Sequence, residues 1–247
     1  MGLFDFLSSK PTPAKIEKLM KRMLNEHHQQ QVRQESAEEL MSIGTPLAIE
    51  ALVRRLGVNF KDTIVNEQEK RWVADTLVEK FGQASVEPLL NFMKKEQNVS
   101  MAVRTLARLV SREKVVVALM DTLAVYAPVD HRTIQAKMQL VDALGDYDDG
   151  RIVAALLPHL ADHDDDVRVK VVELLERKVA GAPEHLAAVT AAFIELLLDA
   201  EAAGRILRRG AEASCALALD LTPARDRILA NLPDGFVLNA QSRLVRR

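Results

Sequence analysis

Hydrophobic residues recur along this chain with the period of an α-helix. After Pro13, five apolar residues fall at i, i+3, i+4, i+7 and i+8, which places them on one helical face: Ile16, Leu19, Met20, Met23 and Leu24. The helical pattern continues to about residue 220. No run within it shows the two-residue alternation of a strand bounded by hairpin signals. The sequence therefore predicts an all-α fold.

Turn signals divide this pattern into short helices. Gly44 ends one helix, and Thr45-Pro46 begins the next, with an N-cap followed by proline at the first helical position. We expect about five to six helix pairs. The helices predicted after residue 60 lie near 67–81, from 86 onward, and near 99–110, 113–126, 131–144, 151–161, 166–178, 184–199 and 201–219.

A basic residue recurs four positions before a small or branched apolar one. The pairs are Arg33 with Ala37, Lys70 with Ala74, Arg132 with Ala136 and Arg168 with Val172. The bases are 37 residues apart in the first two pairs and 36 apart in the last two. Two helices repeating with this period are typical of a solenoid. We expect each base to form one step of an internal ladder, pairing with an acidic turn group of its own or the next repeat, the alternative being a stripe that meets an acidic partner.

One segment, residues 156–168, carries a family resemblance. It reads Leu-Leu-Pro-His-Leu-Ala-Asp-His-Asp-Asp-Asp-Val-Arg, with proline in the first helix, aspartate at the turn and Val-Arg opening the second helix. Residues 45–52 and 85–90 match the first half of this motif, and Val32-Arg33 and Val103-Arg104 match parts of the second. Over roughly residues 30–200 the chain resembles the HEAT-repeat family, including the short bacterial HEAT-like repeats. The resemblance implies an armadillo-like, right-handed α-α superhelix.

Three regions follow from this interpretation. Residues 1–13 form an apolar segment and a Pro-containing linker, residues 14–220 form the repeat domain, and residues 221–247 form a C-terminal capping extension or tail. Terminal repeats need such covers because their outer apolar face would otherwise meet water.

Composition narrows the functional classes. Lys plus Arg number 33 and Asp plus Glu 35, a net charge of −2, whereas a nucleic-acid binder is more often basic. The single cysteine, Cys215, excludes an intramolecular disulfide, and its apolar surroundings predict a buried structural thiol. The sequence shows no apolar stretch long enough for a transmembrane helix and no secretory signal at its start, so we expect a cytoplasmic protein.

Candidate chemistry is sparse. His159 and His163 have metal-ligand spacing beside several aspartates. The interpretation we prefer makes the aspartates helix caps, with Asp165 or Asp166 as N-cap and the adjacent histidine on the surface. No phosphate-binding glycine loop or nucleophile motif occurs. We therefore predict no catalytic residues, no metal and no cofactor, hence a non-enzymatic protein.

Partner contacts are assigned from the family resemblance, since polar residues of second helices line the concave face of HEAT solenoids. The candidates are Glu38, Asp75, Arg104, Arg108, Gln139, Lys170, Glu173 and Arg177. A second candidate is the apolar start of the chain, which either caps the first repeat or docks on a partner groove or peripherally on a membrane. Its residues are Leu3, Phe4, Phe6 and Leu7.

Mixed charge on the candidate face suits a protein surface better than a phosphate backbone. We expect a scaffold or adaptor for a protein or peptide partner. The main alternative is nucleic-acid binding similar to the HEAT-like alkylpurine DNA glycosylases, with Trp72 as a base-stacking platform instead of packing. Arg205, Arg208 and Arg209 would then contribute a positive end, although a solvated face is the simpler interpretation. A bilin-lyase-like or cofactor-chaperone activity is a remote third.

Overall fold

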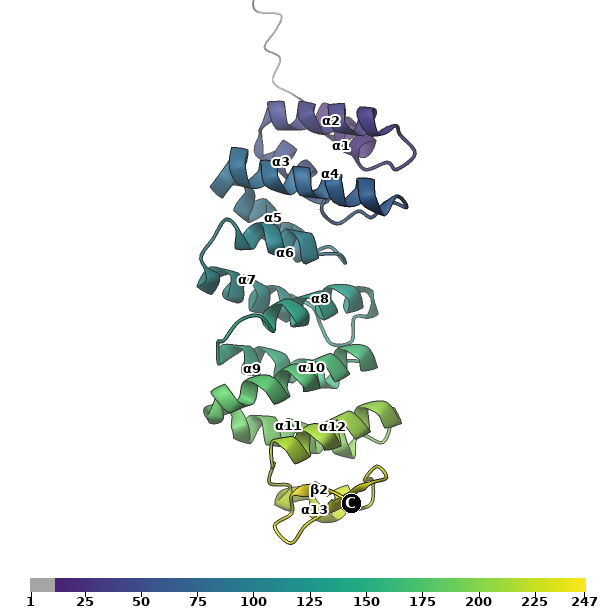
Figure 1. Ribbon diagram of the computed structural model, residues 1–247, viewed down its shortest axis with the longest axis vertical. Helices are drawn as coiled ribbons and strands as arrows, with labels where there is room; N and C mark the ends of the chain where they lie inside the picture. The colour runs from purple at the N-terminus through teal and green to yellow at the C-terminus, as the bar shows by residue number, and fades with distance from the viewer. Residues whose placement is uncertain (1–11) are drawn as a thin grey trace, which may run out of the picture. The chain divides into compact units, whose positions relative to one another are not determined.

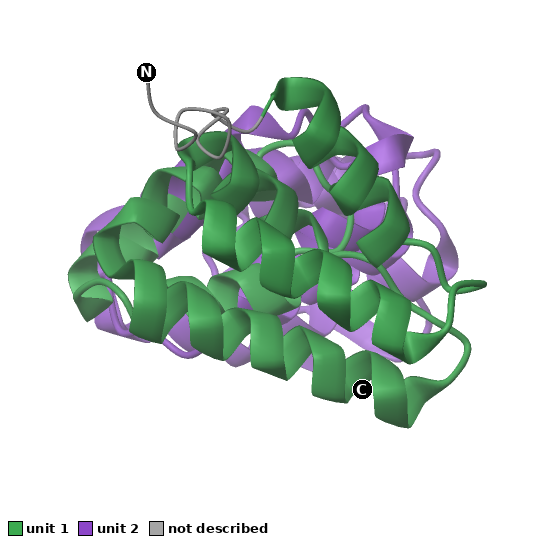
Figure 2. Ribbon diagram, turned by 90° about the horizontal axis from the view of Figure 1, so that it is seen from above, with its two compact units in different colours: residues 1–118 green, residues 119–247 purple. Residues whose placement is uncertain are grey.

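The computed structural model describes residues 12–247 and is predominantly helical, which confirms the expectation of an α-helical protein (Figure 1). The chain divides into two compact units, unit 1 over residues 1–118 and unit 2 over residues 119–247 (Figure 2). Helix α7 (Arg112–Val125) contains the division.

Unit 1 is built from helices that alternate between two layers. Helix α1 contacts α3, and α3 contacts α5, while α2 contacts α4, and α4 contacts α6. The two layers meet through contacts of α1 with α2, of α3 with α2 and α4, and of α5 with α6. The bounds are α1 Pro13–Met23, α2 Gln30–Ile43, α3 Pro46–Arg54, α4 Thr63–Thr76, α5 Val86–Met93 and α6 Ser100–Ala107.

Unit 2 repeats this plan and adds a small sheet. Helix α10 contacts both α8 and α12, and α11 contacts α12, α13 and the 3-10 turn that continues α9. The bounds are α8 Ile134–Leu144, α9 Arg151–Leu156, α10 Asp165–Lys178, α11 Leu186–Leu198, α12 Gly204–Ala216, α13 Arg225–Leu229, β1 Phe236–Leu238 and β2 Leu244–Arg246.

The helix ends have local causes. Thr12 and Thr45 accept a hydrogen bond from the backbone N–H three residues on, and each precedes a proline, which has no N–H to leave unpaired. Asp62 accepts from the N–H groups of Ile64 and Val65 at the start of α4. Gly44 ends α2 in the left-handed region, φ 60°, as its place in the sequence predicted.

Several predicted boundaries were displaced. Pro158 converts the end of the predicted 151–161 helix into a 3-10 turn over Leu157–Ala161, because proline cannot donate the α-helical hydrogen bond. The predicted 67–81 helix begins earlier, at Thr63, and ends in a π-helical turn over Leu77–Phe81. The predicted 99–110 helix ends at Ala107, with a turn after it.

The C-terminal segment contains an antiparallel hairpin that the sequence did not suggest. Phe236 pairs with Arg246 and Leu238 with Leu244, and β2 contacts α12. Phe236 and Leu244 are buried. A turn at Asp234-Gly235 precedes β1, and Gly235 has φ 87°.

Leu52 and Leu47 of α3 provide a test of this packing. Leu52 is fully buried, whereas Leu47 is 42% exposed. We expect Leu52→Ala to lower the free energy of unfolding by about 2–5 kcal/mol, since it removes buried methyl groups and leaves a cavity. Urea denaturation measures the effect, and Leu47→Ala is the control on the same helix. Equal losses for the two variants would contradict the inward orientation of Leu52.

Candidate partner-binding surface

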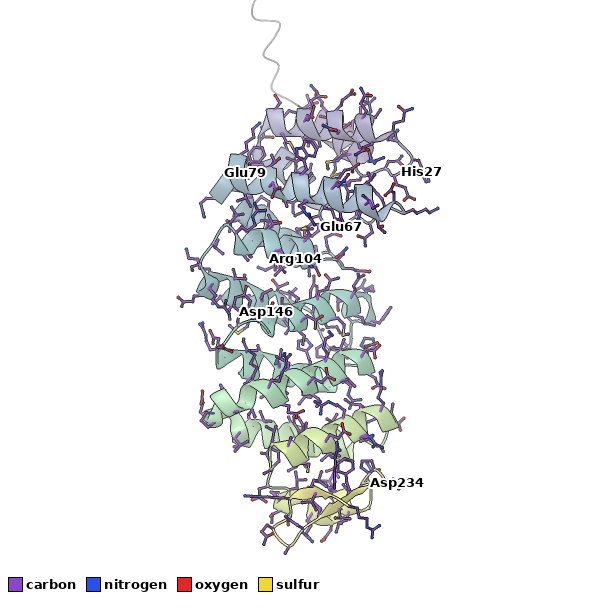
Figure 3. The ribbon with its side chains drawn as sticks, in the orientation of Figure 1. His27, Glu67, Glu79, Arg104, Asp146 and Asp234 are labelled. Carbon is purple, nitrogen blue, oxygen red and sulfur yellow. The ribbon has the colours of Figure 1, made fainter. Side chains whose placement is uncertain are left out.

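The predicted contact residues of unit 1 lie on, or directly after, α2, α4 and α6. Figure 3 labels one of them, Arg104 on α6. Asp75 Oδ1 accepts a hydrogen bond from Arg108 Nη1 at 2.7 Å, which joins α4 to the end of α6. Glu38 is exposed and accepts from Gln34 on its own helix. Arg104 is exposed and forms no ion pair with a described residue. The structure therefore brings Asp75 and Arg108 together and leaves Glu38 and Arg104 open to solvent.

In unit 2 the corresponding residues lie on α8 and α10. Lys170 Nζ donates to Asp142 Oδ1 of α8. On the other side of α10, Glu173 Oε1 lies 3.7 Å from Arg209 Nε of α12. Arg177 is exposed and Gln139 is half-buried. Ion pairs thus connect α8 to α10 and α10 to α12.

Sequence reasoning missed the partners of these residues. Asp142 occupies the exposed side of α8, and Asp166 pairs with Arg205 at 2.7 Å. Glu176 accepts from Arg209 Nη2, and Glu212 lies 3.6 Å from Arg208. The basic cluster of α12 is therefore matched by acids, residue by residue. The available signal for Arg205 and Arg209 was an acid on α10 about one repeat earlier, and for Arg208 it was the acid four residues on along α12.

The recurring bases do not all play the expected part. Arg33 of α2 reaches Glu69 of α4, with 2.6 Å between Nη2 and Oε1, and Arg168 of α10 reaches Asp199 at 2.8 Å. Arg132 is instead exposed and pairs locally with Asp130. The buried base in that repeat is Lys137, five residues later, whose Nζ lies 2.5 Å from Asp162 Oδ2. Arg168 pairs with an acid at a turn, as expected, and so does Arg132, although Arg132 is exposed and not between repeats. Arg33 instead pairs with Glu69 inside α4, and Lys70 donates to the amide oxygen of Asn59.

Glu69 stands between two buried arginines. Arg55 is fully buried, and its Nη2 lies 3.1 Å from Glu69 Oε2. The guanidinium carbons of Arg33 and Arg55 lie 4.9 and 3.9 Å from the centre of the Phe60 ring. Burial lowers the pKa of Arg55, and Glu69 opposes that effect. A single carboxylate and one aromatic ring therefore hold both guanidinium groups.

His163, the histidine next to the capping aspartates, is exposed, as expected. His159 is buried, and its Nδ1 is 3.6 Å from Asp162 Oδ2, too long for a hydrogen bond. His163 Nδ1 is 2.8 Å from the Pro128 carbonyl oxygen. The N-cap of α10 is Asp164, one residue before Asp165, because its carboxylate accepts from two backbone N–H groups.

Asp162 is fully buried beside Lys137. Burial, the largest single influence, would raise the pKa of this carboxyl. His159, Lys137 and the Asp164 N–H together outweigh burial and leave the pKa below its ordinary value. Over the described part of the chain, no group of three or more His, Cys, Asp or Glu side chains is arranged to hold a metal ion.

Trp72 and Cys215 are both half-buried. Trp72 is half-buried on α4, consistent with partial packing. Cys215 is half-buried on α12, so the prediction of a buried thiol was wrong.

An open hollow of about 450 Å³ lies at one edge of unit 1, beside the α1–α2 connection and the start of α4. Its walls combine acids and bases, so no single charge dominates it. The lining includes Glu26, Arg33, Phe60, Lys61 and Asp62.

Leu3, Phe4, Phe6 and Leu7 lie outside the described residues, and their docking stays a prediction. Within residues 12–247, no helix is long and apolar enough to cross a membrane. Comparisons with protein-family models, with curated proteins and with solved structures find no significant match to this chain.

Glu69→Gln tests the two-arginine cluster. Because the change leaves Arg33 and Arg55 buried without a counter-ion, we expect a loss of about 3–5 kcal/mol in the free energy of unfolding. Glu67→Gln on the exposed side of the same helix is the control and should cost less than about 1 kcal/mol. Denaturation of both variants gives the comparison, and a small loss for Glu69→Gln would contradict the pairing.

Asp162→Asn tests the Lys137 pair through its pH dependence. The pKa of Asp162 is below its ordinary 3.8 in the folded protein, so its carboxylate stabilises the fold above that pH. This contribution is lost as the pH falls through the folded pKa. We expect the variant to be less stable than the parent by about 3–5 kcal/mol at pH 7. The gap should narrow below pH 3.8.

Denaturation curves at several pH values measure this gap. Asp234→Asn, at an exposed position, is the control. A gap independent of pH would show that the Asp162 charge is not the stabilising feature.

Proposed function

We propose that this chain is a HEAT-like helical-repeat scaffold that binds a protein or peptide partner on the exposed side of its second helices. The observation that carries the proposal is the set of ion pairs linking neighbouring second helices within each unit. Asp75–Arg108 links α4 to α6, and Asp142–Lys170 links α8 to α10. These pairs present side chains of both signs in a fixed order.

Repeat stacking is supported by the internal pairing. Arg33 and Glu69 are 36 residues apart, one predicted repeat, and they join equivalent helices of successive pairs. The alternation of contacts among α1 to α6 agrees with such stacking. By this proposal each unit contributes a concave row of second helices.

Mixed charge favours a protein partner over nucleic acid. A phosphate backbone binds through unopposed Lys and Arg side chains. In unit 2 the arginines of α12 already face acids, since Arg205 pairs with Asp166 and Arg209 pairs with Glu173 and Glu176. A protein surface with complementary charges is able to bind beside these ion pairs without breaking them.

The helical framework also suits the role energetically. Association costs conformational entropy because side chains and loops become ordered. A surface already held by secondary structure and ion pairs loses less conformational entropy on binding. The proposal assigns no catalytic residue and no cofactor to the chain.

Charge reversal at two positions tests this proposal. Arg104→Glu alters unit 1 and Lys170→Glu alters unit 2, so each should reduce partner recovery about tenfold if it opposes a partner charge. The measurement is quantitative mass spectrometry of proteins cross-linked to the full chain in extracts of its own source. Lys94→Glu and Arg227→Glu are matched controls, because both side chains are exposed and lie outside the second helices.

Unchanged recovery with both test variants would show that the second-helix surface is not the binding site. DNA binding by the purified protein with a steep salt dependence would favour the nucleic-acid alternative.

A further inference from the structure

Unit 1 buries more positive than negative charge at the connection between α3 and α4. Arg33, Arg55 and Lys70 are each less than 7% exposed, and Glu69 is the buried acid among them. Glu69 contacts both arginines but does not pair with Lys70. The exposed Glu67 offsets one further charge. One positive charge in this cluster is therefore left without a matching acid.

Lys70 is the residue that lacks an acid. Its ammonium donates to Asn59 Oδ1, a neutral acceptor, and among the described residues it forms no ion pair. Burial lowers the pKa of Lys70, and nearby Arg55 adds to that effect while Glu67 opposes it. A buried ammonium with one neutral acceptor is an expensive arrangement.

The repeat pattern shows where an acid is missing. Inward positions on α2 are 33, 36, 37 and 40, those on α4 are 70, 73, 74 and 77, and those at α6 are 99, 102, 103 and 106. In this register, Glu69 on α4 corresponds to Asn98 before α6. Arg33 on α2 pairs with Glu69 on α4. Lys70 on α4 is equivalent to Arg33, and the residue equivalent to Glu69 is Asn98, an amide instead of an acid.

Two donors converge on one removable acceptor. Asn59 Oδ1 accepts from Lys70 Nζ and from Asn98 Nδ2, the latter at 3.4 Å. Asn98 Nδ2 also donates to the Gly57 carbonyl at 3.2 Å, which holds it in place. Asn59 is exposed and belongs to the connection between α3 and α4, so its side chain is able to leave without disturbing a helix.

We propose that Lys70 and Asn98 form a binding site for one carboxylate from an acidic segment of a partner protein. The carboxylate replaces Asn59 Oδ1 and accepts from both donors. A single negative charge matches the single uncompensated base, whereas the multiple charge of a phosphate would be repelled more strongly by Glu67, whose charge already acts on Lys70. The site does not depend on the second-helix surface proposed above.

Two variants of the full chain should each prevent the partner carboxylate from binding, one by removing the positive charge and the other by adding a carboxylate to the site. Lys70→Met removes the charge and keeps most of the buried aliphatic chain, and Asn98→Asp supplies an internal carboxylate. The probe is a capped peptide with two glutamates, and its glutamine version is the control peptide. Binding is followed through the side-chain amide signals of Asn59 and Asn98 in NMR spectra.

We expect the glutamate peptide to shift these signals in the parent protein. Both variants should weaken its binding about tenfold or more. Lys61→Met, which removes an exposed charge from the same connection, should bind like the parent.

Four results would overturn the proposal. Three are equal binding of the glutamate and glutamine peptides, unchanged binding in Asn98→Asp, and tighter binding of inorganic phosphate than of the glutamate peptide. The fourth is the absence of any shift in the parent. Thermal melting of both variants beside the parent separates loss of binding from misfolding.

Discussion

Buried charges between successive helix pairs are the constraint on which this structure depends. Leucine and valine fill each layer, but apolar side chains accept several packing arrangements of similar free energy. A buried charge does not, because removing it from water costs several kcal/mol unless a partner meets it with good geometry. Arg33 with Glu69 and Lys137 with Asp162 each satisfy this condition in one register of their helices. We interpret these pairs as the interactions that select the register, while the apolar core supplies most of the stability.

The helical class and many helix ends were predictable because their causes are local. Gly44 and Thr45-Pro46 act on their own backbone, so the sequence alone predicts where α2 ends and α3 begins. The pairing of the recurring basic residues with acids was only partly predictable. A fixed spacing from an apolar residue does not tell which base on a helix turns inward, and in α8 that base is Lys137, not Arg132. The hairpin was missed for a similar reason, since strands of three residues are too short to show an alternating pattern.

On the second helices, the exposure of the candidate contact residues was easier to predict from the sequence than their pairing partners. Of the residues assigned from the family resemblance, Arg108 and Glu173 are exposed, whereas Asp75 and Lys170 are half-buried. Their pairing across helices depends on how neighbours align, which no single helix records. The resulting surface carries little net charge, so recognition there rests on the order of charges and on shape. Lys70 departs from this balance, since the amide of Asn98 stands where the repeat would place an acid.

The C-terminal hairpin has a consequence for how copies of the chain meet. Helical layers that end in an apolar face invite the same layer of another molecule, and repeated contacts of that kind grow into fibres. Here β2 lies against α12, with Phe236 and Leu244 turned inward. Gln241, Arg243 and Arg246 are exposed on the hairpin instead. The exposed side of the hairpin therefore presents polar and positively charged groups to a second copy, instead of the apolar side chains that pack against α12.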